Sequence, residues 1–149
     1  MAKVSVSELA GQHLYLDANI FIYAIERHPD FLARVDSLFT RIDAGEITAT
    51  TSELTIADCL VKPFADNDIA RQGLYQAAIS PRQNFSVVAI SRAILIQAAQ
   101  LRALHKVRLP DAVHLATATA SACQALITND QLIRPISGIP VIQLVDLNV

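Results

Sequence analysis

The sequence predicts an α/β sandwich built on a mainly parallel central sheet, and three observations support this prediction. Short segments rich in β-branched residues alternate with longer segments of helical periodicity along most of the chain, which is typical of parallel sheets covered by helices. The 149 residues are 52% hydrophobic and 17% charged, enough for a compact domain with its own core. No internal repeat or Gly/Ser-rich linker interrupts the chain, so we expect residues 1–149 to form a single domain.

The first strand is expected at residues 13–16, and the apolar run 20–25 continues into a helix. His28-Pro29-Asp30 should end that helix, and Asp30 can cap the next one. In this next helix, apolar residues recur at helical spacing while charged residues fill the opposite face, as in an amphipathic surface helix. The apolar positions are Phe31, Val35, Leu38, Phe39 and Ile42. Gly45 is predicted to end it.

A second strand is predicted at residues 46–50, which are rich in β-branched side chains. The helix that follows has Ser52 as a plausible N-cap and should run to about Val61, because Pro63 would stop it. Residues 66–79 are predicted to form a further helix. The alternation of strand and helix therefore continues through the middle of the chain.

The second half of the chain continues this alternation. Ser91 can cap one helix, and Pro110 is acceptable in the first turn of another, whose Ala- and Thr-rich sequence suggests close packing on several sides. The expected elements are a strand at 85–90, helices at 91–104 and 109–122, and strands at 125–128 and 139–144.

Composition narrows the possible function classes. The longest apolar runs are far shorter than the ~20 residues that span a bilayer, and the N-terminus lacks the apolar core of a signal peptide, so we expect a cytoplasmic protein with no membrane partner. Cys59 and Cys123 have no metal-ligand spacing and should be reduced and buried. The net charge of −2 argues against a broad nucleic-acid docking surface, but less against a nucleic-acid enzyme whose carboxylates bind divalent ions.

Four acidic residues have positions that suggest a shared site. Asp17 follows the first strand within apolar surroundings, and Asp130 lies two residues after the strand 125–128. Ligand sites in parallel sheets lie at the carboxyl ends of strands. Asp58 and Asp111 lie on helices whose starts could face the same edge. Burying a carboxylate without a partner charge is costly, so we expect a cation to meet Asp17.

Each of the four also has a simpler structural interpretation, which the sequence leaves open. Asp17 could cap a helix, Asp58 could pair with Lys62 one turn later, and Asp111 could complement its helix dipole. Asp130 could cap a short turn. One metal site would explain all four positions together, whereas these alternatives require four separate reasons.

Carboxylate oxygens suit hard cations such as Mg²⁺ and Mn²⁺. Two such ions ~4 Å apart can activate a water and hold the attacking and leaving oxygens of a phosphodiester. The chain lacks a GxxxxGK[ST] sequence and a GxGxxG loop, which argues against P-loop and dinucleotide-binding classes. A receiver-like phosphoryl transfer is disfavoured because no Lys follows the late strands. The residues that could assist the carboxylates are Ser52, Glu53, His114, Thr128 and Asn129.

Four segments resemble, in order, the motifs of PIN-domain ribonucleases, and in particular the VapC-type toxins of bacterial toxin–antitoxin pairs. They are residues 15–23, 51–58, 110–118 and 126–130. The resemblance covers nearly the whole chain. The family usually has Glu at the position of Asp58, whose side chain is one methylene shorter.

This resemblance implies a three-layer α/β/α, PIN-like fold and Mg²⁺- or Mn²⁺-dependent cleavage of RNA. It implies that Asp17 and Asp111 are the main metal ligands, that Asp130 completes the acidic pocket, and that Asp58 binds or positions metal or water. It also implies a homodimer and an antitoxin whose tail covers the site. The alternative is a weak or inactive PIN-like domain that acts by binding RNA or protein. Candidates to line an RNA path are Arg27, Lys62, Arg71 and Arg82.

Overall fold

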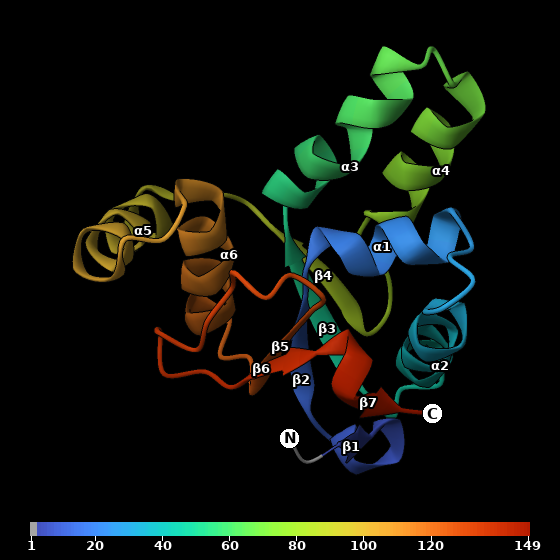
Figure 1. Ribbon diagram of the computed structural model, residues 1–149, viewed down its shortest axis with the longest axis horizontal. Helices are drawn as coiled ribbons and strands as arrows, with labels where there is room; N and C mark the ends of the chain where they lie inside the picture. Colours follow the sequence, from blue (N-terminus) through green and yellow to red (C-terminus); the bar gives the residue numbers. More distant parts are fainter. Residues whose placement is uncertain (1–2) are drawn as a thin grey trace.

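The structure, a computed structural model, describes residues 3–149. Its centre is a five-stranded, entirely parallel sheet in the order β4-β3-β2-β5-β6, with helices on both faces (Figure 1). The expected three-layer α/β/α sandwich is therefore confirmed. The strands of this sheet are β2 (His13–Leu16), β3 (Thr48–Ser52), β4 (Phe85–Val88), β5 (Ala125–Thr128) and β6 (Val141–Gln143). A second, two-stranded parallel sheet pairs β1 (Val4–Ser5) with β7 (Leu147–Asn148).

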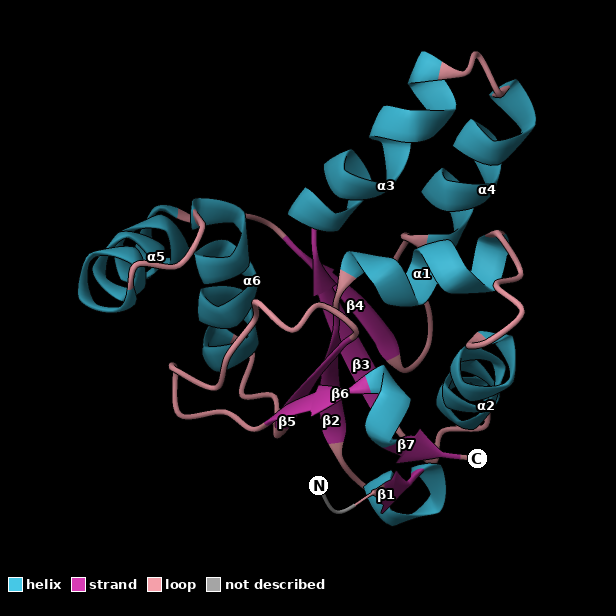
Figure 2. Cartoon of the chain, in the orientation of Figure 1, coloured by secondary structure: helices cyan, strands magenta, loops and turns pink. Residues whose placement is uncertain are grey.

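The helices divide between the two faces of the sheet (Figure 2). One side carries α1 and α2, the other carries α5 and α6, and α3 and α4 form a hairpin that projects away from the sheet. Their bounds are α1 (Ala18–Ile25), α2 (Leu32–Asp43), α3 (Leu54–Ala65), α4 (Ile69–Ala78), α5 (Arg92–His105) and α6 (Leu109–Ala120), with the 3-10 helices η1 (Val6–Leu9) and η2 (Leu144–Asp146). Among residues 3–149, no helix is both long and apolar enough to cross a membrane.

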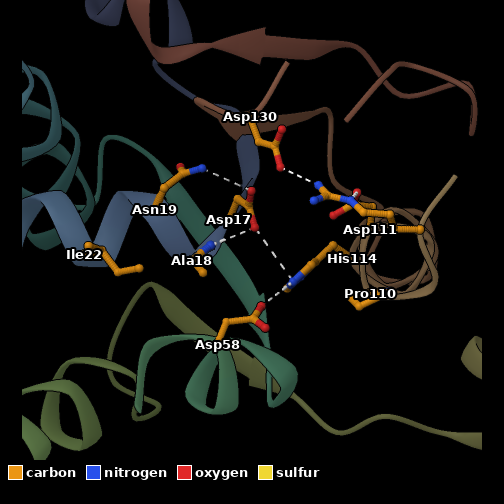
Figure 3. A pocket seen from close by; sticks show the side chains of 10 residues that line it. Asp17, Ala18, Asn19, Ile22, Asp58, Pro110, Asp111, His114 and Asp130 are labelled. Carbon is orange, nitrogen blue, oxygen red and sulfur yellow. Dashed lines mark hydrogen bonds and ion pairs between the residues drawn. The ribbon is translucent and has the colours of Figure 1, made fainter. Parts of the chain in front are cut away.

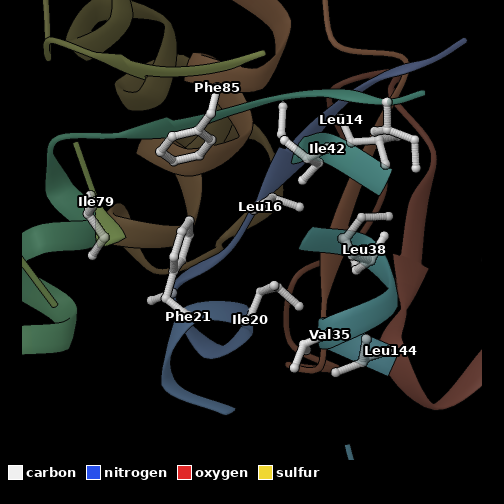
Figure 4. Packing of buried hydrophobic residues seen from close by; sticks show 14 of the residues in the cluster. Leu14, Leu16, Ile20, Phe21, Val35, Leu38, Ile42, Ile79, Phe85 and Leu144 are labelled. Carbon is white, nitrogen blue, oxygen red and sulfur yellow. The ribbon is translucent and has the colours of Figure 1, made fainter. Parts of the chain in front are cut away.

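Two hydrophobic cores lie on opposite faces of the sheet, because successive side chains of a strand point to opposite sides. Leu14 and Leu16 of β2 join the core under α1 and α2 (Figure 4), whereas Tyr15 between them joins the core under α5 and α6. Phe21 of α1 is 1% exposed in the first core, and full burial of such a side chain stabilises the fold by about 1.5–3 kcal/mol. Together these cores hold the ends of β2 and β5 in place.

The observed bounds confirm several expected elements. The strands β2 and β5 span the predicted residues, and the Ser91 hydroxyl caps α5 by accepting a 3.2 Å hydrogen bond from the Ile94 N–H. Cys59 and Cys123 are buried free thiols, as expected. Burial raises the pKa of each thiol to about 12, so both remain protonated at neutral pH.

Other boundaries differ from the expectation. The strand β3 begins and ends two residues later than predicted, so Ser52 ends the strand and Glu53 is the N-cap of α3. The Ser52 hydroxyl nevertheless accepts a 3.0 Å hydrogen bond from the Leu54 N–H. The helix α3 continues through Pro63, which lies in its last turn and is buried, so packing of the ring offsets the one missing backbone donor.

Two further helix starts also differ from the expectation. Phe31 is the N-cap of α2, in place of Asp30, and makes no side-chain capping bond. The helix α4 starts at Ile69 because the Asp68 carboxylate accepts a 3.1 Å hydrogen bond from the Arg71 N–H. The short terminal pair β1 and β7 is not predicted by the sequence, because strands of two residues carry no detectable periodicity.

The strand order places a topological switch point between β2 and β5. From β2 the chain moves outward through β3 and β4, and it then returns to the other side of β2 as β5 and β6. The register pairs Leu16 with Ile127, so Asp17 and the residues after Thr128 leave the sheet at the same edge. Ligands of open α/β sheets bind at such points.

Candidate active site

All four predicted aspartates line one cavity of about 370 Å³ at this edge (Figure 3). They come from separate parts of the fold: the end of β2, the middle of α3, the first turn of α6 and the loop after β5. The four are Asp17, Asp58, Asp111 and Asp130. The remaining lining residues are Ala18, Asn19, Ile22, Arg108, Pro110 and His114. The structure thus brings together the four aspartates that the sequence selected as one site.

Asp17 caps a helix, which was the simpler interpretation considered from the sequence, and it also lines the cavity. One carboxylate oxygen, Oδ1, accepts a 2.8 Å hydrogen bond from the Ala18 N–H and caps α1. The other, Oδ2, accepts a 2.7 Å bond from the Thr128 hydroxyl and a weaker one from the Asn19 amide at 3.4 Å. The residue is 6% exposed. The cap therefore fixes this carboxylate in the cavity and does not exclude a role there.

Asp58 approaches the cavity through His114 of α6. The Nε2 of His114 donates to Asp58 Oδ2 at 2.9 Å and lies 3.8 Å from Asp17 Oδ1. The other ring nitrogen, Nδ1, shares a 2.5 Å hydrogen bond with the buried Tyr15 hydroxyl. Among residues 3–149, Asp58 makes ion-pair contacts only with His114, so the pair with Lys62 that the sequence left open does not form.

Arg108 joins the other two carboxylates. Its Nε donates to Asp111 Oδ2 and its Nη2 donates to Asp130 Oδ2, each at 2.6 Å. Asp130 also uses Oδ1 to accept from the Leu132 N–H at 2.9 Å. Asp130 thus caps the turn that the sequence suggested and still contributes an oxygen to the cavity.

The acids of the cavity lie close together and are partly buried, and both features shift pKa values in the cavity. Burial raises the pKa of Asp111, and the charges of Asp130 and Asp17 add to this, while Arg108 partly opposes it. Burial lowers the pKa of His114, but the hydrogen bond to Asp58 and the charges of Asp17, Asp58 and Asp111 outweigh it, so the net pKa is raised. The raised pKa of His114 therefore reflects the surrounding carboxylates, whereas burial is the main cause of the raised pKa of Asp111.

The side chains as they stand do not form a metal centre. Within residues 3–149, no three His, Cys, Asp or Glu side chains are placed to hold one ion. The hydrogen bonds explain this, because each carboxylate is already engaged by a protein donor: Asp17 by Thr128, Asp58 by His114, and Asp111 and Asp130 by Arg108. The guanidinium of Arg108 lies between the carboxylates of Asp111 and Asp130. Carboxylate oxygens such as these are the ligands that Mg²⁺ and Mn²⁺ prefer.

Sequence reasoning missed Arg108 and Tyr15. Arg108 precedes Asp111 by three residues at a helix start, a spacing typical of local ion pairs, so the sequence does carry a signal for its pairing with Asp111. Tyr15 lies in an apolar strand, where the sequence does not distinguish it from an ordinary core residue. Of the assisting residues considered, Glu53 does not line the cavity and Asn129 donates instead to the Tyr23 hydroxyl at 3.1 Å.

Comparisons with known proteins agree with this arrangement. A family model described as the PIN domain matches residues 14–138. A toxin–antitoxin complex from Klebsiella pneumoniae contains a chain 24% identical to this one, with a TM-score of 0.64 and coverage of 88% of this chain and 97% of that chain. VapBC2 from Rickettsia felis, bound to a promoter DNA fragment, shows 18% identity, a TM-score of 0.62 and coverage of 88% and 98%. FitAcB from Neisseria gonorrhoeae shows 15% identity, a TM-score of 0.65 and coverage of 88% and 97%.

None of the curated proteins matches the sequence. The structural likenesses, all below 25% identity, show the fold, and the family match spans most of the chain, including the segments that carry the four aspartates. The family inferred from the four sequence motifs is thereby confirmed: this chain belongs to the PIN domain family.

Proposed function

We propose that this protein is a divalent-metal-dependent endoribonuclease and the toxin of a toxin–antitoxin pair. The observation that carries the proposal is the convergence of four aspartates, distant in sequence, on one cavity at the switch point of the sheet. PIN domains are generally nucleases that depend on divalent metals. Several of the structures that resemble this chain come from toxin–antitoxin complexes.

The roles we propose for the residues follow from their contacts. Asp17, Asp111 and Asp130 would hold Mg²⁺ or Mn²⁺, and Asp58 would bind or position the metal or its water from the far side of the cavity. The bound ion supplies a water of lowered pKa and neutralises charge on the phosphodiester. Thr128 fixes the orientation of Asp17, and His114 holds Asp58 toward the centre of the site.

The test is a cleavage assay on purified protein with a mixed-sequence RNA. We expect cleavage with added Mg²⁺ or Mn²⁺ and none with chelator. Asp17→Asn should abolish cleavage yet keep the fold, because asparagine caps a helix about as well as aspartate. Asp36→Asn, an equivalent change on the exposed face of α2, is the control and should cleave normally. Equal cleavage by wild type and Asp17→Asn would refute the site.

The competing proposal is a weak or inactive PIN-like domain that acts by binding RNA or protein. Two observations favour it: Arg108 already neutralises Asp111 and Asp130, and Asp58 is shorter than the Glu usual in the family. It predicts weak Mn²⁺ binding and no turnover with any divalent ion. Two measurements separate the proposals: a calorimetric titration with Mn²⁺ and an RNA cleavage assay on the same protein.

We also propose a homodimer that works in the cytoplasm and is inhibited by a cognate antitoxin. Toxin–antitoxin complexes among the similar structures support the antitoxin. The α3–α4 hairpin supports a protein partner as well, because it carries large exposed apolar side chains. These are Val61, Phe64, Ile69 and Leu74. Light scattering on the purified chain tests the dimer, and co-purification with the product of an adjacent reading frame tests the antitoxin.

A further inference from the structure

Arg108 is the basic residue that lines the acidic cavity. It precedes α6, and its side chain is 54% exposed while its guanidinium bonds to Asp111 Oδ2 and Asp130 Oδ2. Of the described residues that line this cavity, Arg108 is the only arginine or lysine. Because the Arg108 side chain is exposed, a change of its rotamer can move the guanidinium away from these two oxygens. Such a change requires no backbone movement and exposes no apolar core.

Arg108 also borders a second, basic surface that Asp17 does not line. It lines one hollow with Arg102 and Lys106 from the end of α5 and the turn after it, and another with Lys106 and Arg134. We call Arg102, Lys106, Arg108 and Arg134 the basic edge. Asp111 is the only acidic residue among the described residues that line these two hollows. The acidic cavity and the basic edge therefore meet at Arg108 and Asp111.

A hydrogen bond fixes part of the basic edge, and its side chains are exposed to solvent. Arg134 donates from Nη2 to the His105 carbonyl at 2.9 Å, which fixes the loop after β5 against the end of α5. All four basic side chains belong to exposed residues. Within residues 3–149, Arg108 alone among them is engaged in ion pairs. By contrast, Arg71 and Arg82, two of the residues expected from sequence to line an RNA path, pair with acids elsewhere on the surface.

We propose that the basic edge binds the phosphate backbone of the RNA substrate, and that Arg108 exchanges between two partners during loading. In the structure Arg108 bonds to Asp111 and Asp130. A divalent cation bound to those oxygens would release the guanidinium, which would then bind an RNA phosphate beside the site. This inference rests on the proposed nuclease function. It explains how a chain of net charge −2 can hold a polyanion, since the positive charge is concentrated at one border of the acidic cavity.

The physical basis is competition for the same two oxygen atoms. A guanidinium and a divalent cation cannot both occupy them, so Arg108 must lower the apparent affinity for the cation. Guanidinium groups bind phosphate through the same paired N–H geometry with which they bind carboxylates. Removing Arg108 should therefore have opposite effects on the two ligands: tighter metal binding and weaker RNA binding. A residue with a merely structural role would weaken both.

The first experiment measures Mn²⁺ affinity by calorimetry without RNA. Arg108→Gln should bind Mn²⁺ on the order of tenfold more tightly than wild type, as expected for the loss of one competing ion pair. Arg102→Gln removes the same charge nearby without touching the carboxylates and should have a much smaller effect. Arg92→Gln, at the opposite end of α5, should have none. An affinity for Arg108→Gln that equals that of Arg102→Gln would overturn the exchange.

The second experiment measures binding of a labelled single-stranded RNA by fluorescence anisotropy in chelator, where no cleavage occurs. Gln substitutions at Arg102, Lys106 and Arg134 should each weaken binding, and the slope of log affinity against log salt should fall by about 0.7 for each phosphate that the variant no longer neutralises. Arg92→Gln should bind like wild type. With Mn²⁺ present, Arg108→Gln should raise the KM for RNA while kcat changes little.

The outcomes separate this inference from the proposed function. If no RNA is ever cleaved but the Mn²⁺ and RNA affinities change as described, the nuclease proposal fails and the basic edge stands. If cleavage is normal but the basic-edge variants bind RNA like Arg92→Gln, the basic edge is wrong. Loss of binding to a protein partner by these variants, with RNA affinity unchanged, would also overturn it, because the surface would then be a protein-binding one.

Discussion

His114 Nε2 on α6 lies 2.9 Å from Asp58 Oδ2 on α3, and this hydrogen bond links helices that pack in different hydrophobic cores. It crosses the carboxyl edge of the sheet beside Asp17, which is 3.8 Å from the same nitrogen. The contact explains how an aspartate on α3 can belong to the cavity although its side chain is short: a buried histidine extends from the opposite side to meet it.

The first prediction concerns the pH dependence of stability in the metal-free protein. The net pKa of His114 is raised above its usual 6.5, so the protonated ring stabilises the folded state. This contribution is fully present below about pH 6.5 and is lost as pH rises through the raised, folded-state pKa. His114→Gln should remove that fall in stability. Chemical denaturation between pH 6 and pH 9 in chelator checks it, and an unchanged pH profile in the variant would contradict it.

The second prediction concerns the buried hydroxyl behind His114. Tyr15→Phe removes the partner of His114 Nδ1 and should lower the free energy of unfolding by about 1–3 kcal/mol, the cost of leaving a buried polar group unsatisfied. Tyr23→Phe is the control, since its hydroxyl accepts from Asn129 in a half-buried position where water can replace it. Urea denaturation compares the two variants, and a loss of stability in Tyr15→Phe no larger than that in Tyr23→Phe would contradict the prediction.

The third prediction addresses the length of the side chain at position 58. Asp58→Glu adds the methylene that PIN domains usually have there, so its carboxylate should reach further toward Asp17 and bind Mn²⁺ more tightly. Asp58→Asn keeps the length but removes the charge, and it should bind Mn²⁺ more weakly than wild type. Calorimetric titration ranks the three proteins. The prediction fails if the Glu variant binds Mn²⁺ as weakly as the Asn variant.

The fourth prediction concerns metal removal. If the cavity binds Mn²⁺ only in the folded state, Mn²⁺ at 100 times its Kd should raise the free energy of unfolding by about 2.7 kcal/mol, and chelator should reverse the change. Asp111→Asn should respond far less because it loses a ligand. The control is Asp36→Asn, whose response should match that of wild type. Thermal unfolding with and without Mn²⁺ measures each response, and an equal shift in the Asp111 variant would rule out this carboxylate as a ligand.

The sequence by itself determined the architecture and the acidic members of the site. The strands β2 and β5 could be located because each is a short apolar run whose limits are set by neighbouring residues. Asp17 follows β2 directly and Asp130 lies two residues after β5, and the general rule for parallel sheets placed them at one edge. Asp58 and Asp111 were selected because they lie on predicted helices whose starts could face the same edge, and the order of the four family motifs agreed with that choice.

Only the tertiary structure decided how those carboxylates are neutralised. Arg108 and Asp130 are 22 residues apart, and Tyr15 and His114 are 99 apart. No pattern of neighbouring residues encodes such contacts, because they depend on how the sheet aligns strands and on which rotamers the two cores allow. Propensity and periodicity are local quantities, whereas the pairing of side chains across the sheet is fixed by packing of the whole chain. For that reason the four aspartates and an assisting role of His114 could be inferred from the sequence, whereas the contact of Arg108 with Asp130 and that of His114 with Tyr15 could not.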